Sequence, residues 1–261
     1  MYEFDIEKPS TIDEAVAALA NDEAQALGGG QTLIPTLKQR LAAPGVLVSL
    51  RGIEDMVGVS PTHDPGAFIG GATTHAEVAR EAAAFYPALA ALAGGIGDPA
   101  VRNRGTIGGS LANNDPSACY PAAALGSGAA IFTNKREIAA DDFFTGLFET
   151  ALEDGEIITG VRFPAPMAAN YQKFEQPASR FALVGVFVAK YDDGVRVAVT
   201  GASEDGVFRW AEAEAALSTN FAPEALDGMT PGGDMIGDIH GSPEYRAHLV
   251  GVLTKRAVAA I

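Results

Sequence analysis

Two glycine-rich segments are the parts of this chain best suited to bind a ligand. The first runs from Gly28 to Thr32 (GGGQT) and the second from Thr106 to Ser110 (TIGGS). In each segment small residues leave the backbone N–H groups unobstructed, and a hydroxyl group lies beside them. Consecutive N–H groups of this kind form nests that bind phosphate oxygens. Two such segments in one chain predict a clamp on one large phosphorylated ligand, such as a dinucleotide.

Each segment also has a simpler interpretation. The stretch Leu27–Pro35 (LGGGQTLIP) is compatible with a tight turn from a strand into a helix. It matches neither GxGxxG nor a Walker loop, and because no GK[ST] follows, ATP hydrolysis is disfavoured. The second segment is expected to form a loop, and Arg102 and Arg104 flank it either as electrostatic support for phosphates or as ordinary exposed charges.

Several other polar residues have two interpretations each. Asn113–Pro116 (NNDP) could reach ribose hydroxyls or a flavin edge, or could form a turn. Thr74 and His75 place a hydroxyl beside an imidazole, but a Ser-His-Asp triad is weakly supported without a GxSxG elbow, and Thr74 suits a helix cap. Cys119 is typical of a small buried apolar residue, and Lys173 is either a cation aimed at an anion or a solvated side chain.

Composition excludes several classes of protein. The 261 residues carry a net charge of −15, which disfavours nucleic acid and anionic membranes as partners. One cysteine cannot form an intrachain disulfide, a CxxC zinc site or a four-thiolate iron–sulfur cluster, and the four histidines lack a metal-binding spacing. The first residues do not resemble a signal peptide and no apolar run reaches about 18 residues, so we expect a cytoplasmic protein without a membrane span.

The elements that must position the glycine segments begin with a small βαβαβ unit. Strands are expected at 2–6, 24–27 and 46–50, and helices from 11 onward and over 32–41. This arrangement places the first glycine segment between a strand and a helix, where phosphate loops are usually found.

Two further regions follow this unit. Residues 53–165 read as an α+β sheet, with helices at 74–84, 87–93 and 121–125 among strands at 56–60, 68–70, 129–133, 137–139 and 157–163. Pro164–Pro166 breaks the pattern. A hairpin is then expected over 183–201 with its turn at Asp192–Gly194, followed by a strand at 207–210 and helices at 211–217 and 243–260.

The motifs, taken in order, resemble one known family. GGGQTLIP, GATTH, RNRGTIGGSLANNDP, EIITGVRFP and YQKF are similar to the FAD-binding medium subunit of the molybdenum hydroxylases, the group of aerobic carbon monoxide dehydrogenase and bacterial xanthine dehydrogenases. The resemblance spans the whole chain. It implies an α+β fold of the vanillyl-alcohol-oxidase (PCMH) type with two α/β FAD-binding subdomains, 1–52 and 53–166. A C-terminal α+β domain of the carbon monoxide dehydrogenase flavoprotein type would occupy 167–261.

The resemblance also implies where FAD binds. Residues 27–34 and 106–110 would hold the pyrophosphate, Ile96 and Ile158 would contact the flavin, and Lys173 would lie near its carbonyl groups. Many members have Asp where this chain has Cys119; a thiol is a weak acceptor, and Asp115 is the alternative ribose ligand. No catalytic side chain and no metal ligand is expected. The full set of expected FAD-binding residues is Leu27, Gly28, Gly29, Gly30, Gln31, Thr32, Leu33, Ile34, Thr74, Ile96, Gly105, Thr106, Ile107, Gly108, Gly109, Ser110, Asp115, Cys119, Ile158 and Lys173.

The implied role is that of an electron-transfer subunit. A large subunit with a molybdopterin cofactor and a small 2Fe–2S subunit would be the partners, in a dimer of heterotrimers, and NAD, a quinone or oxygen would accept the electrons. The substrate, whether carbon monoxide, a purine, an aldehyde or an N-heterocycle, would bind in the large subunit. Two alternatives are a stand-alone FAD-dependent reductase of the enolpyruvylglucosamine-reductase type and a flavin-free interaction module.

Overall fold

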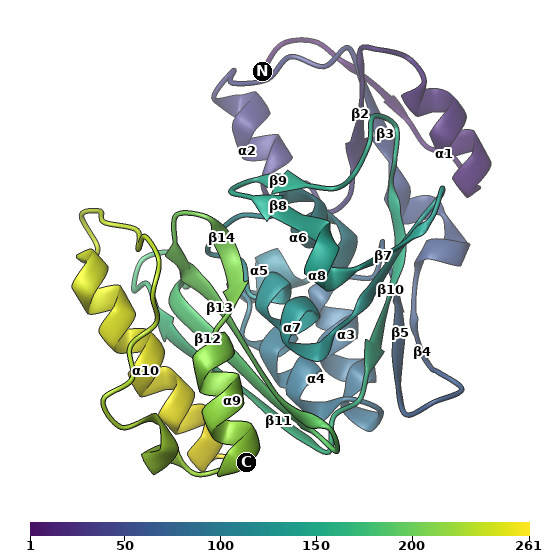
Figure 1. The fold of residues 1–261 in the computed structure, drawn as a ribbon. Helices are drawn as coiled ribbons and strands as arrows, with labels where there is room; N and C mark the ends of the chain where they lie inside the picture. The colour runs from purple at the N-terminus through teal and green to yellow at the C-terminus, as the bar shows by residue number, and fades with distance from the viewer.

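The computed structural model describes all residues from Met1 to Ile261. The structure contains three main sheets with helices packed around them (Figure 1). The first sheet is parallel in the order β1-β3-β2, and its elements are β1 (Asp5–Glu7), α1 (Ile12–Leu19), β2 (Ala24–Leu27), α2 (Leu33–Lys38) and β3 (Val46–Ser49). Thr11 caps α1 by accepting a hydrogen bond from the Glu14 amide at 3.2 Å. The expected βαβαβ unit is therefore present, although α2 ends three residues before the predicted end.

The second sheet is antiparallel in the order β4-β5-β10-β6-β7. Its strands are β4 (Val59–Pro61), β5 (Gly66–Gly70), β6 (Ala130–Thr133), β7 (Glu137–Ala139) and β10 (Ile158–Pro164). The helices among them are α3 (His75–Glu81), α4 (Pro87–Gly94), α5 (Pro99–Arg102), α6 (Ile107–Asn113), α7 (Tyr120–Ser127) and α8 (Ala140–Phe143). Short 3-10 helices lie at Leu50–Gly52, Glu54–Met56 and Ala82–Ala84, and a separate hairpin joins β8 (Phe144–Gly146) to β9 (Glu149–Thr150).

Two expectations for this region are corrected. The strand expected from Met56 begins only at Val59, because residues 54–56 form a 3-10 turn. The second glycine segment, expected as a loop, is the start of α6. Thr106 is its N-cap and its hydroxyl accepts a hydrogen bond from the Gly109 amide at 3.2 Å, so the cap offsets the low helix propensity of two glycines.

The third sheet is an antiparallel meander of β11 (Ala168–Glu175), β12 (Ala182–Tyr191), β13 (Gly194–Ser203) and β14 (Gly206–Arg209). Strand β12 is buried on both faces because its side chains alternate between two cores. Val184, Val186 and Val188 pack with α9 (Ala211–Thr219) and α10 (Pro243–Ala259). Phe187 and Ala189 face the core that includes α7.

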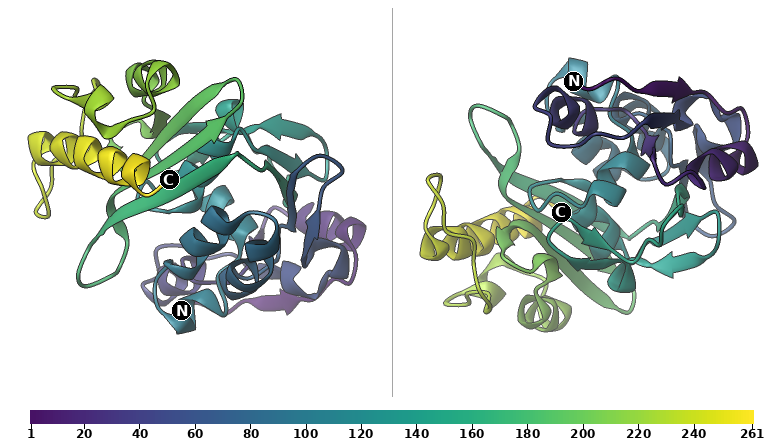
Figure 2. Two further views of the ribbon diagram at one scale, coloured as in Figure 1. Left: turned by 90° about the horizontal axis from the view of Figure 1, so that it is seen from below. Right: turned by 90° about the horizontal axis from the view of Figure 1, so that it is seen from above.

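The C-terminal helices lie on the outer face of this third sheet. Figure 2 shows α10 at the opposite end of the molecule from α1. One further 3-10 helix, Pro223–Leu226, lies between α9 and α10. The three main sheets fall within 5–49, 59–164 and 168–209, and the domain boundaries at 52 and 166 stay predictions. No helix in this structure combines the length and apolar character that crossing a bilayer requires.

Candidate functional site

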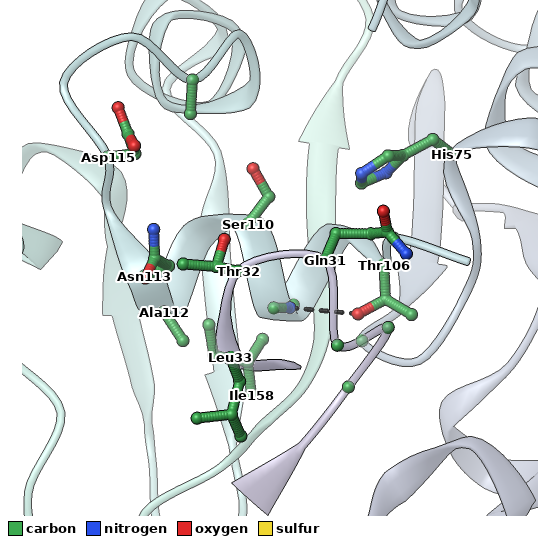
Figure 3. Close-up of a pocket in the computed structure, with 18 of the residues that line it drawn as sticks. Gln31, Thr32, Leu33, His75, Thr106, Ser110, Ala112, Asn113, Asp115 and Ile158 are labelled. Atoms are coloured by element: carbon green, nitrogen blue, oxygen red, sulfur yellow. Dashed lines mark hydrogen bonds between the residues drawn. The ribbon is translucent and has the colours of Figure 1, made fainter. Parts of the chain in front are cut away.

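The expected FAD-binding segments border one cavity of about 410 Å³ (Figure 3). A cavity of this size falls within the range of small-molecule and cofactor sites, about 300–1,000 Å³. Its walls come from the β2–α2 loop, the start of α3, the loops on either side of α5, helix α6, the loop after α6 and the segments before β10 and β12. Residues from around all three sheets therefore meet at this cavity.

The two glycine segments lie against each other, backbone to backbone. A Cβ on Gly29 would overlap the carbonyl oxygen of Arg104 and come within 2.5 Å of the Gly105 Cα. A Cβ on Gly28 would lie 2.8 Å from the Thr106 hydroxyl oxygen. Real Cβ atoms do not approach other atoms this closely, so glycine is required here by the packing of one segment on the other.

The two segments differ in the backbone groups that they leave free. The amides of residues 28–33 donate no hydrogen bond within the chain, and Thr32 makes no side-chain cap for α2. In the second segment the amide of Ile107 donates to Thr73 and that of Gly108 donates to Gly71, at 3.1 and 2.9 Å. The amides of Gly109 and Ser110 are also used, by the side chain and carbonyl of Thr106.

The expectation that both segments offer free N–H groups is therefore wrong for residues 107–110 of the second one, where every amide donates within the chain. What the second segment presents to the cavity is the hydroxyl of Ser110 and two glycines without side chains, while the first segment contributes Gln31 and Thr32 to the same lining (Figure 3). The free amides at 28–33 are the backbone donors that this part of the lining could offer to an anion.

Most of the expected cofactor-binding residues line the cavity, and four do not. Those that do are Leu27, Gly28, Gly29, Gly30, Gln31, Thr32, Leu33, Ile96, Gly105, Thr106, Gly108, Gly109, Ser110, Asp115, Cys119 and Ile158. Of the others, Ile107 packs in the core and Ile34 packs beside Gly30. Thr74 is the N-cap of α3 in a capping box with Glu77, so the cap interpretation of this residue holds.

Lys173 also lies outside the cavity lining. Its side chain is only 7% exposed, and its ammonium group donates to the carbonyl oxygens of Gly95 at 2.7 Å and Arg180 at 2.9 Å. Glu175 lies 3.4 Å away. The lysine is thus neither solvated nor free, because it ties β11 to the segments that carry Ile96 and Arg180 to the cavity wall.

The polar residues near α6 separate into structural and cavity-facing groups. Asn114 is the left-handed C-cap of α6, and its side-chain amide donates to the carbonyls of Gly146 and Glu149. Asn113 and Asp115 line the cavity, where one Asp115 carboxylate oxygen accepts from the Ser117 amide at 2.8 Å. Only part of the NNDP motif is therefore a turn.

Three further groups settle earlier alternatives. Arg102 donates to the carbonyls of Ile96 and Gly97, so it shapes the cavity wall and does not itself line the cavity. Cys119 is buried at the cavity, and burial raises the pKa of its thiol, which keeps it neutral. The Nδ1 atom of His75 has no hydrogen-bond partner, so it is not part of a Ser-His-Asp triad.

The motifs did not predict several of the residues that line the cavity. Glu156 borders it with its side chain buried, and Arg136 donates to both of its carboxylate oxygens at 3.1 and 3.0 Å. That hydrogen bonding lowers the pKa of Glu156 from 4.5 to about 2, so the carboxylate is ionised at neutral pH. Arg180 and Phe181 reach the cavity from the loop before β12, and no local sequence signal marks any of the three.

The third sheet holds one wall of the cavity in place. The Thr200 hydroxyl on β13 lies 2.7 Å from the Pro116 carbonyl oxygen and 2.8 Å from that of Ala118. The Gly201 amide also donates to Pro116, at 2.7 Å. These bonds fix the segment between α6 and α7, which supplies Asp115 and Cys119 to the cavity.

We expect Thr200→Val to lower the free energy of unfolding by about 1–3 kcal/mol and to weaken cofactor retention. Valine keeps the shape of threonine but leaves buried carbonyl oxygens short of a donor. Urea unfolding and cofactor stoichiometry measure the two effects. Thr219→Val is the matched control, since its exposed hydroxyl bonds only within α9. Equal stabilities of the two variants would contradict the assigned role.

Fold and cavity together define a protein that binds a phosphorylated cofactor. Comparison with known proteins makes this class specific: residues 2–166 match the family described as FAD binding domain in molybdopterin dehydrogenase. The chain belongs to the FAD-binding medium subunits of the molybdenum hydroxylases. FAD is its cofactor, and it is an oxidoreductase subunit.

The similarity extends along nearly the whole chain. The carbon monoxide dehydrogenase medium chain of Afipia carboxidovorans is 34% identical, covering 98% of this chain and 95% of that one. The nicotine 6-hydroxylase medium subunit of Paenarthrobacter nicotinovorans is also 34% identical, covering 96% and 94%. Among solved structures, the reconstituted carbon monoxide dehydrogenase from Oligotropha carboxidovorans has a TM-score of 0.89 at 31% identity, covering 99% and 98%. The expected α+β FAD-binding fold is confirmed.

The cavity suits FAD on structural grounds of its own. The free amides at 28–33 suit a pyrophosphate. The three glycines at 28–30 have no side chains that could cover their amides. Ile96 and Ile158 supply apolar surface for an aromatic ring system.

Proposed function

We propose that this chain is the electron-transfer subunit of a heteromeric molybdenum hydroxylase. In this role it receives electrons from 2Fe–2S clusters of a small partner subunit and passes them to NAD, a quinone or oxygen. The observation that carries the proposal is the single cavity that joins both glycine segments, with a row of unpaired amides on one wall. Bound FAD supplies the redox chemistry, and the protein positions and tunes the cofactor.

The residues present suggest a division of labour around FAD. Residues 28–33 would bind the pyrophosphate through their amides and through the side chains of Gln31 and Thr32. The second glycine segment would contribute the Ser110 hydroxyl and close backbone approach. The apolar walls at Ile96 and Ile158 would enclose the ring system and exclude water. No side chain at the cavity is assigned an acid or base role.

Asp115 is our choice for the ribose ligand in place of Cys119. The second carboxylate oxygen of Asp115 is not used by the bond to Ser117, and a carboxylate is a strong acceptor for a hydroxyl. The thiol of Cys119 is neutral and buried, and sulfur accepts hydrogen bonds weakly. The ribose contact would therefore lie four residues closer to α6 along the chain.

Partners are proposed because this chain cannot perform the whole reaction. Its one cysteine cannot hold a 2Fe–2S cluster, which takes four ligands, mostly thiolates. The relatives named for carbon monoxide dehydrogenase and for nicotine 6-hydroxylase are equally similar to it. Selection of the substrate is therefore assigned to a large partner subunit with a molybdopterin cofactor, and the complex is proposed to be a dimer of heterotrimers.

Reconstitution of the purified chain tests this function. We expect one FAD per chain by flavin absorbance, and anaerobic bleaching of that absorbance when a reduced 2Fe–2S partner subunit is added. The chain alone should oxidise no hydroxylase substrate. Oxidation of such a substrate without partners would contradict the assigned role, and rapid partner-free NADPH oxidation would favour the stand-alone reductase. A chain that binds no FAD would favour the interaction module.

A further inference from the structure

His75 is a cavity-lining residue for which the chain itself supplies no partner. It is the first residue of α3, is 5% exposed and lines the cavity, where Figure 3 shows its imidazole near Gln31. Its amide donates to the Gly105 carbonyl oxygen at 3.0 Å, and its ring packs on Tyr120 with the centroids 5.3 Å apart. Backbone and ring contacts therefore fix the imidazole at the wall.

The two ring nitrogens have different surroundings. Nδ1 is inaccessible and has no hydrogen-bond partner. Nε2 faces Gly105, where an added Cβ would come within 2.5 Å of it, and Gly105 itself lines the cavity. Nε2 likewise makes no hydrogen bond within the chain, but it lies on the cavity side of the ring, so it is the nitrogen that remains available to a ligand.

The ring is neutral at ordinary pH. The pKa of His75 is lowered to about 4, mainly by burial and in smaller part by the nearby positive charge of Arg102. A neutral imidazole carries its single N–H on one of the two nitrogens. Buried N–H groups without an acceptor are rarer than buried acceptors without a donor. The N–H is therefore assigned to Nε2, on the cavity side, and the lone pair to Nδ1.

We propose that His75 is a ligand of FAD that donates a hydrogen bond from Nε2 to an oxygen atom of the cofactor. This inference rests on the proposed function, which places FAD in this cavity. It adds a neutral donor, contributed by α3, to the two glycine segments. The neutral state matters because a neutral donor leaves no buried charge in the protein when the cavity is empty.

Two variants of His75 test the proposal through binding, without any need for activity. His75→Leu has similar bulk and no nitrogen, whereas His75→Gln can place an amide N–H close to the position of Nε2. FAD titration of the apo-protein, followed by flavin fluorescence, should give a dissociation constant about tenfold higher for His75→Leu. His75→Gln should recover most of this loss, staying within about threefold of the unaltered chain.

Urea unfolding of the apo-proteins separates a binding role from a structural one. We expect His75→Leu to be at least as stable as the unaltered chain, because leucine removes an unpaired buried nitrogen. Nitrogen-15 NMR of labelled histidine should show the Nε2–H tautomer. An unchanged dissociation constant for His75→Leu, or equally weak binding by both variants, overturns the proposal. An unaltered chain that takes up no FAD refutes the proposed function itself, which is a distinguishable result.

Discussion

Gly29→Ala should abolish stable FAD retention and lower the free energy of unfolding by about 3 kcal/mol. The added methyl group would overlap the Arg104 carbonyl oxygen and crowd the Gly105 Cα, and both are backbone atoms that cannot rotate away. Overpacking of a fitted contact typically costs about 1–3 kcal/mol, and a backbone obstacle places this site at the upper end. The segments must separate to admit the methyl group, which moves the free amides at 28–33 away from the second segment.

Flavin absorbance after desalting and urea unfolding of the apo-protein measure these two effects. Gly232→Ala is the matched control, because a Cβ there meets no atom within 4 Å and the residue has no left-handed backbone. We expect the control to retain FAD and to unfold like the unaltered chain. If Gly29→Ala behaved as the control does, the close packing of the two segments would not be what forms the site.

Gly109→Asp should weaken FAD binding by at least a hundredfold while leaving the fold intact. Gly109 is exposed on the cavity side of α6, and the nearest atom to an added Cβ is the Thr106 hydroxyl oxygen at 3.0 Å. An aspartate there would face the bound pyrophosphate. Two like charges about 4 Å apart repel by roughly 4 kcal/mol at an effective dielectric constant of about 20. Combining Gly109→Asp with Thr106→Ala, which removes the cap of α6, should weaken FAD binding further.

Gly109→Asn isolates the charge in this experiment, because asparagine has the same shape as aspartate without the negative charge. Calorimetric titration of FAD into each apo-protein should show much tighter binding by the asparagine variant, and added salt should narrow the gap. Equal dissociation constants for the two variants would show that no phosphate group lies near α6. In that case the free amides of the first segment alone would hold the pyrophosphate.

Local signals in the sequence were sufficient for much of the fold. The turn at Asp192–Gly194 between two apolar runs predicted the hairpin of β12 and β13, and strand 24–27 matches β2 residue for residue. The final helix was expected over 243–260 and runs from Pro243 to Ala259, with Ser242 as its cap. These elements are set by near neighbours in the chain, through turn chemistry, capping and apolar periodicity.

Helix α6 shows why a correctly identified motif was assigned the wrong structure. Its glycines are poor helix formers, so residues 106–110 read as a loop. The helix forms because Thr106 caps it and because the amides of Ile107 and Gly108 donate to Thr73 and Gly71, which lie far away in sequence. No local pattern reports those partners.

By itself, the sequence determined the family, the FAD cofactor and the two segments that border the cavity, because motif order and residue type carry that information. Tertiary structure decided which groups remain available to a ligand. It paired the amides of the second glycine segment, left those of the first free, bound Lys173 to backbone carbonyls and left His75 without a partner. The physical reason is that a hydrogen bond or an orphaned polar atom depends on which distant residues come within about 3 Å, and spacing along the chain does not encode that distance.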